Sequence, residues 1–530
     1  MARQMLMGAV MALTASGLLA PAFADVPLPR IAPRTDILLG SFQPPAAPLT
    51  TVEDALRREV RADVSMGVDE FYESRGYRPF WTEDAAADLA VALGNARQDG
   101  LNPADYAMPL RHGLGVVATA RYDVALTETA LRYASHVHSG RTNPRKVRRI
   151  IDVDPPVLDA QAFLKSLAEG DAASAFEGAH PPHEAYHALR KHLRRALGET
   201  VYIHPKVGRG QNLRLGSSGP RVATLRARLG VTVKRGDDPT VFDESLRDAV
   251  KDFQRANKLG ADGIVGPRTV RALDGTGQID PVPVLIANLE RWRWMPRDLG
   301  ERHVFVNIPA FEVRVSHEDE EVYRGRVVVG KRSNPTPIFS DVMEHAVVNP
   351  YWNVPYSIAS KEMLGSLRSN PGGFTRRHNY EVVMNGRVVN ASSVSWTPAN
   401  LRRVRIRQRP GRGNALGRVK FLFPNKHAVY LHDTPSKHLF RRTKRAYSHG
   451  CIRVHQPFVF ADALLQGEPE LTGSSLKRMI GGGERWVNLK SDVKVHLAYF
   501  TAEPAADGAL TLHGDVYGID TSTLRALDVR

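Results

Sequence analysis

The sequence contains a single cysteine, Cys451, among 530 residues. One cysteine cannot form an internal disulfide, so a disulfide framework is excluded for the isolated chain. The sequence also has no zinc-finger pattern and no aromatic-rich RNA-binding signature, which argues against nucleic acid as a partner. The formal net charge of +16 instead favours acidic partners, such as anionic polymers or carboxylate-rich substrates.

Long apolar runs are missing beyond the N-terminus. The first 24 residues combine a positive charge at Arg3, a nearly uncharged apolar stretch and the small residues of Ala22-Phe23-Ala24. This pattern predicts a signal peptide over residues 1–24 that is cleaved before Asp25. An uncleaved anchor is the alternative, although the apolar stretch is short for a membrane span. We therefore expect a periplasmic or otherwise exported chain, with no transmembrane segment after cleavage. In such an oxidising compartment a lone thiol is unusual.

The length predicts a multidomain α+β protein of two to four domains. Residues 25–49 are rich in Pro and Ala and are expected to be a flexible linker. Helical periodicity then begins at Val52, Leu56 and Val60, with Thr51 as a possible N-cap, and a second helix capped by Thr82 is expected to end near Gly100. Further helices are predicted over 122–138 and 182–197. We expect residues 50–205 to form a helical scaffold domain.

Residues 207–275 are expected to form a small three-helix unit. Apolar residues recur at helical spacing, and glycines mark the turns between the helices. The segments LRLGSSGPRV, DAVKDFQRANKL and DGIVGPRTVRAL follow one another between Leu213 and Leu273. In this order they resemble the peptidoglycan-binding domain type 1. The resemblance implies a domain that binds cell-wall peptidoglycan; a generic three-helix bundle is the alternative.

The character of the sequence changes to β after Asp280. Valines and isoleucines alternate over 304–308 and again over 313–315, which predicts strands. We expect a β-rich catalytic domain over residues 301–500 and a C-terminal tail over 501–530. An irregular basic stretch, about 358–413, interrupts the β pattern. Its arginines at 402, 403, 405, 407, 409 and 412 form either a solvated flexible loop or a lid that attracts carboxylate-bearing substrates.

The segment that carries chemistry runs from Tyr430 to Arg453. A thiol is mostly protonated at neutral pH and needs a nearby base or positive charge to become a nucleophile. His432 and His449 are both candidates for the base of Cys451, and sequence spacing alone does not choose between them. Amides near Gly450 can face a developing oxyanion, because a residue without a Cβ allows close approach. Arg453 offers a permanently charged fork suited to a carboxylate.

Residues 413–454 are similar over their whole length to the L,D-transpeptidase (YkuD-like) family, large multidomain branch. The match includes Tyr430-Leu431-His432-Asp433 and Ser448-His449-Gly450-Cys451. The resemblance implies a catalytic group of Cys451 as nucleophile, His432 as general base and the Asp433 carbonyl that orients it. Asp433 departs from many small family members, which have Gly or Ser there. Substrate contacts are expected from a wider set: Tyr430, Ser448, His449, Gly450 and Arg453. For Tyr430 simple packing is the alternative, and for Ser448 loop support is favoured over a nucleophilic role.

The resemblance implies a cysteine thioester formed on a tetrapeptide donor stem and resolved by an amine of an acceptor stem, giving a 3→3 cross-link. No cofactor and no metal are expected, since the spacing of His432, His438, His449 and His455 matches no zinc motif. Peptidoglycan stems are the expected partners, with other cell-wall synthesis proteins possible, and carbapenems are the expected inhibitors. Water or a lipoprotein lysine as acceptor, and a non-catalytic wall-binding protein, are the alternatives.

Overall fold

A computed structural model describes residues 49–62, 67–113, 115–198, 206–233, 236–257, 259–275, 280–468, 470–505 and 507–529. The predicted signal peptide and nearly all of the predicted linker lie outside these residues. In the part of the chain that is described, no helix combines the length and apolar character needed to cross a bilayer.

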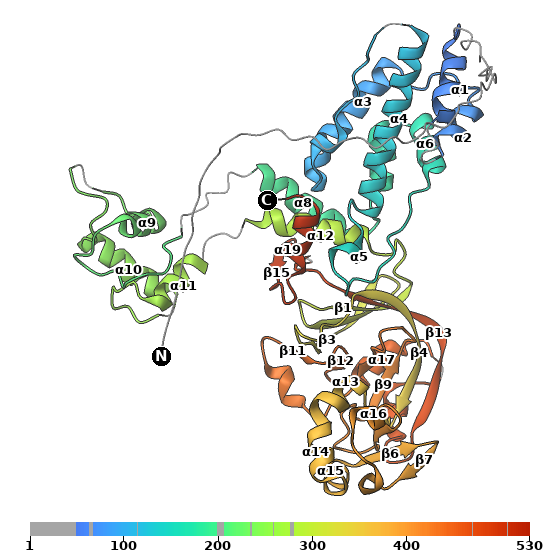
Figure 1. The fold of residues 1–530 in the computed structure, drawn as a ribbon. Coiled ribbons are helices and arrows are strands. Elements are labelled where there is room, and N and C mark those ends of the chain that lie inside the picture. The colour runs from blue at the N-terminus through green and yellow to red at the C-terminus, as the bar shows by residue number, and fades with distance from the viewer. Residues whose placement is uncertain are drawn as a thin grey trace, which may run out of the picture. The chain divides into compact units, whose positions relative to one another are not determined.

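The first described region is helical (Figure 1). Its helices are α1 (Val52–Ala62), α2 (Val68–Ser74), α3 (Glu83–Gly94), α4 (Val116–Ser139), α5 (Pro144–Val147), α6 (Ala160–Glu169), α7 (Ala172–Ala179) and α8 (Glu184–Gly198), with 3-10 turns η1 (Asn95–Asp99) and η2 (Pro103–Tyr106). The predicted caps are confirmed: Thr51 Oγ1 accepts a hydrogen bond from the Asp54 amide at 3.1 Å, and Thr82 Oγ1 accepts one from Ala85 at 3.2 Å. Leu56, Leu89 and Leu131 are fully buried in one apolar core. The helical prediction for this region is therefore confirmed.

The next unit contains three helices, as predicted: α9 (Pro220–Leu229), α10 (Glu244–Ala256) and α11 (Pro267–Gly275). Leu225, Phe242, Leu246 and Val250 are fully buried between them. The Asp243 side chain caps α10 by accepting the Leu246 amide at 2.8 Å. Val222 and Leu225 lie three positions apart on α9, and Leu246 and Val250 lie four apart on α10, so each helix has one apolar face to bury.

A nine-stranded sheet forms the core of the β-rich region. It contains β1 (Arg302–Asn307), β2 (Glu312–His317), β3 (Glu320–Gly330), β4 (Phe339–Val348), β9 (Val419–Leu422), β10 (Leu431–His432), β11 (Ala446–Ser448), β12 (Ile452–Val454) and β13 (Arg485–Ala498). The strand order is β11-β3-β12-β10-β9-β4-β13-β1-β2, and β2 pairs again with β3. That second pairing closes eight of the strands on themselves. Helix α12 (Pro281–Arg293) precedes the sheet, and α17 (Pro457–Leu464) and α18 (Gly473–Arg478) follow β12. The predicted α+β architecture is confirmed.

The stretch expected to be irregular is folded, so that expectation is wrong. The folded insertion begins a few residues earlier than expected, with β5 (Trp352–Asn353) and α13 (Tyr356–Ile358). Its other helical elements are a π-helical turn (Ala359–Met363), α14 (Leu364–Ser369), α15 (Pro371–His378), a 3-10 turn (Ala391–Ser393) and α16 (Pro398–Leu401). Strand β5 joins β8 (Arg405–Gln408), β6 (Tyr380–Met384) and β7 (Arg387–Val389) in a sheet of order β5-β8-β6-β7. Leu367, Val382, Trp396 and Ile406 form its apolar core. This core could not be predicted from local periodicity, because the residues that form it lie on separate short elements.

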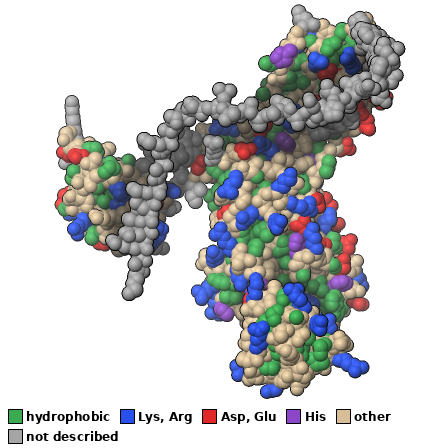
Figure 2. All heavy atoms as spheres, in the orientation of Figure 1, with side chains coloured by type: hydrophobic (Ala, Val, Ile, Leu, Met, Phe, Trp, Pro, Cys, Tyr) green, Lys and Arg blue, Asp and Glu red, His purple; other side chains and the backbone are tan. Residues whose placement is uncertain are grey.

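The arginines of this insertion are not one basic patch. Arg407 and Arg409 both pair with the buried carboxylate of Glu381, each at 2.6 Å. The Arg402 guanidinium lies 4.4 Å from the ring centroid of Tyr356. Lys and Arg side chains are scattered over the visible face rather than gathered at one place (Figure 2). Much of the charge of this stretch therefore serves the packing of the insertion itself.

Because two histidines are buried, we expect the free energy of unfolding to fall at acidic pH. Burial lowers the pKa of His138 and of His496 to about 4 in each case. Because the unfolded chain then binds more protons below pH 6.5, their stabilising contribution is complete above that pH and is lost as pH falls toward 4. Each histidine is expected to lower the free energy of unfolding by up to about 1.4 kcal/mol per pH unit in this window.

Urea unfolding at pH 7.5 and pH 5.0 measures this effect. His496→Gln is expected to show a smaller loss of stability between the two pH values than the unaltered chain. An equal loss in both chains would contradict the assignment.

Candidate active site

The pairing of two short strands assembles the candidate site. β10 and β12 are parallel neighbours, with Leu431 opposite Ile452 and His432 opposite Arg453. Paired residues point to the same side of a sheet, and side chains alternate along each strand. His432 and Arg453 therefore share one side with the residues two positions earlier, Tyr430 and Cys451. The register brings together four of the residues singled out from the sequence.

His432 is buried, with 4% of its surface exposed. Its Nδ1 lies 2.5 Å from the carbonyl oxygen of Asp433. Since a carbonyl only accepts hydrogen bonds, Nδ1 must carry the proton and Nε2 must present its lone pair. Burial, and after it the charge of Arg453, lowers the pKa of His432 to about 3, against the opposite effect of the Asp433 and Leu416 carbonyls. The imidazole is thus a neutral base at physiological pH.

Cys451 is half-buried, and two residues form hydrogen bonds with its thiol. Its Sγ donates to the Ala428 carbonyl across 3.9 Å, and the Tyr430 hydroxyl hydrogen bonds to the thiol. Burial raises the pKa of Cys451, while Tyr430 and the charge of Arg453 oppose the increase. Tyr430 also packs edge-on against His432, with ring centroids 5.7 Å apart. Because the thiol pKa is raised and the imidazole pKa is lowered, both groups are uncharged before reaction.

A hydrogen-bonded loop presents the thiol. Ser448 Oγ donates to the Cys451 carbonyl at 2.5 Å and accepts from the Gly450 amide at 3.1 Å. Gly450 has a φ of +122°, a backbone conformation that favours glycine. The sequence predicted that amides near Gly450 can face the developing oxyanion. The Gly450 amide instead donates its hydrogen bond to Ser448 Oγ, so it is not free for that role. Ser448 supports the loop from within.

The Asp433 side chain forms bonds that hold the local backbone in place. Its carboxylate accepts the Arg418 amide at 2.9 Å and pairs with Lys437 Nζ. Gly417, at a φ of +64°, leaves the space that this carboxylate fills. The side chain therefore fixes the backbone whose carbonyl orients His432.

Two residues outside the predicted catalytic and substrate-binding set form hydrogen bonds that support this loop. Thr336 Oγ1 donates to the Gly450 carbonyl at 2.7 Å and accepts the Gly330 amide at 2.9 Å. Tyr517 is buried, accepts from the Thr336 amide at 3.2 Å and donates to the Gly330 carbonyl at 2.7 Å. Tyr517 lies in the tail segment Asp515-Val516-Tyr517-Gly518, which also resembles the large multidomain branch of the family. The predicted tail folds as β14 (Ala502–Pro504), β15 (Leu510–Leu512) and α19 (Ile519–Ala526).

Asp152, also not singled out, holds the loop that carries Ala428. Its carboxylate pairs with Lys426 Nζ and His427 Nε2, each at 2.8 Å, and with Arg145 Nε at 3.0 Å. The hydrogen bond from Lys426 is the main cause of a pKa lowered to about 2 for Asp152. This carboxylate thus joins the helical region to the loop beside the thiol.

His449 lies apart from the buried group. Its side chain is exposed, and its Nε2 contacts Glu362 of the insertion at 2.7 Å and Lys331 Nζ at 3.3 Å. Among the described residues, one group, Glu301, His317 and Glu318, brings potential metal-ligating atoms within 4.8 Å of one another. That group contains none of the residues predicted for the active site.

Comparisons with known proteins match three regions of the chain. Residues 301–470 match the L,D-transpeptidase catalytic domain, 67–193 match the "Scaffold domain", and 218–273 match the "Putative peptidoglycan binding domain". Over residues 301–470 the chain is therefore similar to the L,D-transpeptidase catalytic domain of YkuD type.

A curated relative from Haemophilus influenzae, described as "Putative L,D-transpeptidase", is 34% identical over 239 residues. The match covers 44% of this chain and 48% of the relative, so the chain spans about half the length of that protein. Solved L,D-transpeptidases from Xylanimonas cellulosilytica and Mycobacterium smegmatis are 16% and 14% identical. They cover 55% and 37% of this chain, and 98% and 58% of their own, with TM-scores of 0.15 and 0.19.

Proposed function

We propose that this protein is a cysteine-dependent L,D-transpeptidase that forms 3→3 cross-links in peptidoglycan. The observation that carries the proposal is the shared side of β10 and β12, where Tyr430, His432, Cys451 and Arg453 meet. A nucleophile, a neutral base with a fixed tautomer and a permanent positive charge are the groups that acyl transfer needs. The peptidoglycan-binding family match supports a cell-wall substrate, and an exported location agrees with it.

In the first half-reaction, Cys451 Sγ attacks the carbonyl carbon between the third residue of the donor stem, a diamino acid, and its terminal D-Ala. His432 Nε2 takes the thiol proton and passes it to the departing D-Ala amine, and the acyl group remains on sulfur as a thioester. The Cys451 amide is the donor proposed for the oxyanion, since Ser448 occupies that of Gly450.

In the second half-reaction, the side-chain amine of an acceptor stem attacks the thioester carbonyl. The amine loses a proton to His432, the new amide forms, and the proton returns to Sγ. No bond energy from another source is required, because the thioester retains the energy of the cleaved peptide bond. Arg453 lies beside the thiol and its Nε is buried without a partner among the described residues, so it is proposed to receive a stem carboxylate.

Incubation of the purified protein with disaccharide-tetrapeptide tests the reaction. Mass spectrometry is expected to show a cross-linked dimer that has lost one D-Ala, with no change on addition of EDTA. If a disaccharide-tripeptide were the sole product, water would be the acceptor, and the protein would be a carboxypeptidase rather than a cross-linking enzyme. Loss of the dimer in EDTA, with recovery on addition of zinc, would overturn the metal-independent mechanism.

A further inference from the structure

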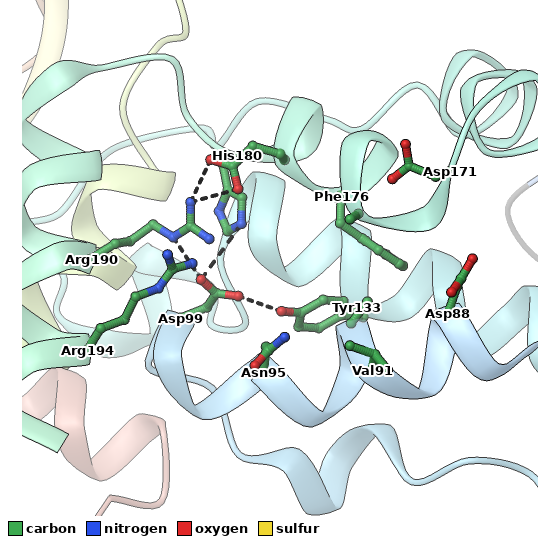
Figure 3. A pocket seen from close by; sticks show the side chains of 13 residues that line it. Asp88, Val91, Asn95, Asp99, Tyr133, Asp171, Phe176, His180, Arg190 and Arg194 are labelled. Atoms are coloured by element: carbon green, nitrogen blue, oxygen red, sulfur yellow. Dashed lines mark hydrogen bonds and ion pairs between the residues drawn. The ribbon is translucent and has the colours of Figure 1, made fainter. Parts of the chain in front are cut away.

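A polar pocket lies in the helical region, on elements with no part in the proposed chemistry (Figure 3). Its cavity volume is about 310 Å³. Helix α3 with η1 forms one wall, α7 and the segment after it form the other, and α4 and α8 contribute Tyr133, Arg190 and Arg194. The α3 side is a single helix face, with lining residues at 88, 91, 92, 95 and 99. The α7 side repeats that spacing at 173, 176, 177 and 180.

The floor of the pocket is a largely buried network of hydrogen bonds. Asp99 is 2% exposed and accepts Arg190 Nε at 2.8 Å and the Tyr133 hydroxyl at 2.5 Å. Arg190 Nη1 also donates to both Glu177 oxygens, at 2.8 and 3.0 Å. His180 is buried and bonds the Tyr186 hydroxyl through Nδ1 at 2.8 Å. The hydrogen-bonding groups of the floor are therefore satisfied internally and need no ligand, and their bonds connect η1 with α4, α7 and α8.

The rim carries charges that the network does not use. Arg194 and Asp88 are exposed and form no hydrogen bond or ion pair with any residue that the structure describes. Asp171 caps α7, accepting the Ser174 amide and hydroxyl at 2.8 Å each, and these bonds lower the pKa of its carboxyl. It remains ionised and keeps lone pairs for a further donor.

These rim charges are separated by sign along the pocket. Asp88 and Asp171 lie at one end and Arg194 lies at the other, with Val91, Tyr133 and Phe176 between them (Figure 3). Arg190 lies at the Arg194 end, but its charge is already paired with Asp99 and Glu177. Val91 is 68% exposed and forms part of the apolar middle. An elongated ligand with an ammonium group at one end, an apolar middle and a carboxylate at the other matches this order.

We propose that this pocket is a second, non-catalytic binding site for a short zwitterionic peptide, whose carboxylate pairs with Arg194 and whose ammonium group pairs with Asp88 and Asp171. A stem fragment that ends in a diamino acid and D-Ala has this chemistry. That choice of peptide rests on the proposed function, whereas the charge pattern does not. Binding here would hold stem peptide near the enzyme without exposing it to Cys451.

Hydrogen–deuterium exchange on the full chain carrying Cys451→Ser tests the site with disaccharide-tetrapeptide as the probe. Peptides spanning 83–99 and 171–180 are expected to gain protection. Arg194→Glu is expected to weaken binding about tenfold, because one charge-assisted hydrogen bond is replaced by repulsion. Lys191→Glu, an exposed charge reversal on the same helix but outside the pocket, is the matched control and should leave the protection unchanged.

Two modified probes separate the ends of the ligand. Amidation of the D-Ala carboxylate should remove the sensitivity to Arg194→Glu, and acetylation of the diamino-acid amine should remove sensitivity to Asp88→Asn. Absence of protection at 83–99 and 171–180, or equal protection in Arg194→Glu, would overturn the proposal. Turnover of the same probe by the unaltered enzyme is measured in parallel. Turnover without protection rejects this pocket alone, and protection without turnover rejects the proposed reaction alone.

Discussion

Cys451→Ala is expected to abolish cross-linking and to leave the fold intact. The substitution removes one sulfur atom from a half-buried position, and the loop keeps its Ser448, Gly450 and Thr336 hydrogen bonds. Cys451→Ser is expected to be equally inactive, since a hydroxyl is a far weaker nucleophile beside the same base. The dimer yield by mass spectrometry and an unchanged circular dichroism spectrum measure the two parts of this prediction.

A carbapenem provides an independent readout of the same sulfur. Its strained ring is an activated amide, so attack by Cys451 should leave one added carbapenem per chain in intact-protein mass spectrometry. The adduct should be missing from Cys451→Ala and Cys451→Ser. An adduct that persisted in Cys451→Ala would assign the reaction to another residue and would end the thiol mechanism.

His432→Ala is expected to lower the rate of acylation by roughly 10²–10⁴-fold. The thiol pKa is raised by burial, so without a base few molecules carry a thiolate at neutral pH. The rate of the variant should therefore increase steadily with alkaline pH, as the thiol ionises by itself. In the unaltered enzyme the His432 pKa of about 3 keeps the imidazole neutral, so protonation of this residue should not reduce the rate between pH 7 and 5.

His449→Ala is the matched control for this prediction. Its ring is exposed and contacts Glu362 and Lys331 rather than the thiol, so a much smaller loss is expected. Stopped-flow acylation by a carbapenem across pH 5–10 measures all three proteins. A nearly inactive His449→Ala beside an active His432→Ala would reverse the assignment of the base.

The helices and their caps were predictable because their signals are local. Thr51, Thr82 and the apolar residues at three- and four-residue spacing act within one or two turns of chain. The insertion was not predictable in the same way, because Leu367, Val382, Trp396 and Ile406 meet only after short strands pair across long separations. The roles of Thr336 and Asp152 were hidden for a similar reason, since each contacts residues more than one hundred positions away.

The sequence by itself determined the chemistry available to this protein: one thiol, two histidines near it and an arginine two residues beyond. Tertiary structure decided which histidine shares the side of Cys451, because the β10–β12 register places His432 opposite Arg453 and leaves His449 on an exposed loop. It also decided the protonation states, which depend on burial and on neighbouring charges rather than on residue identity. A linear motif specifies the atoms of a site, but strand pairing and exclusion of water set their orientation and their pKa values.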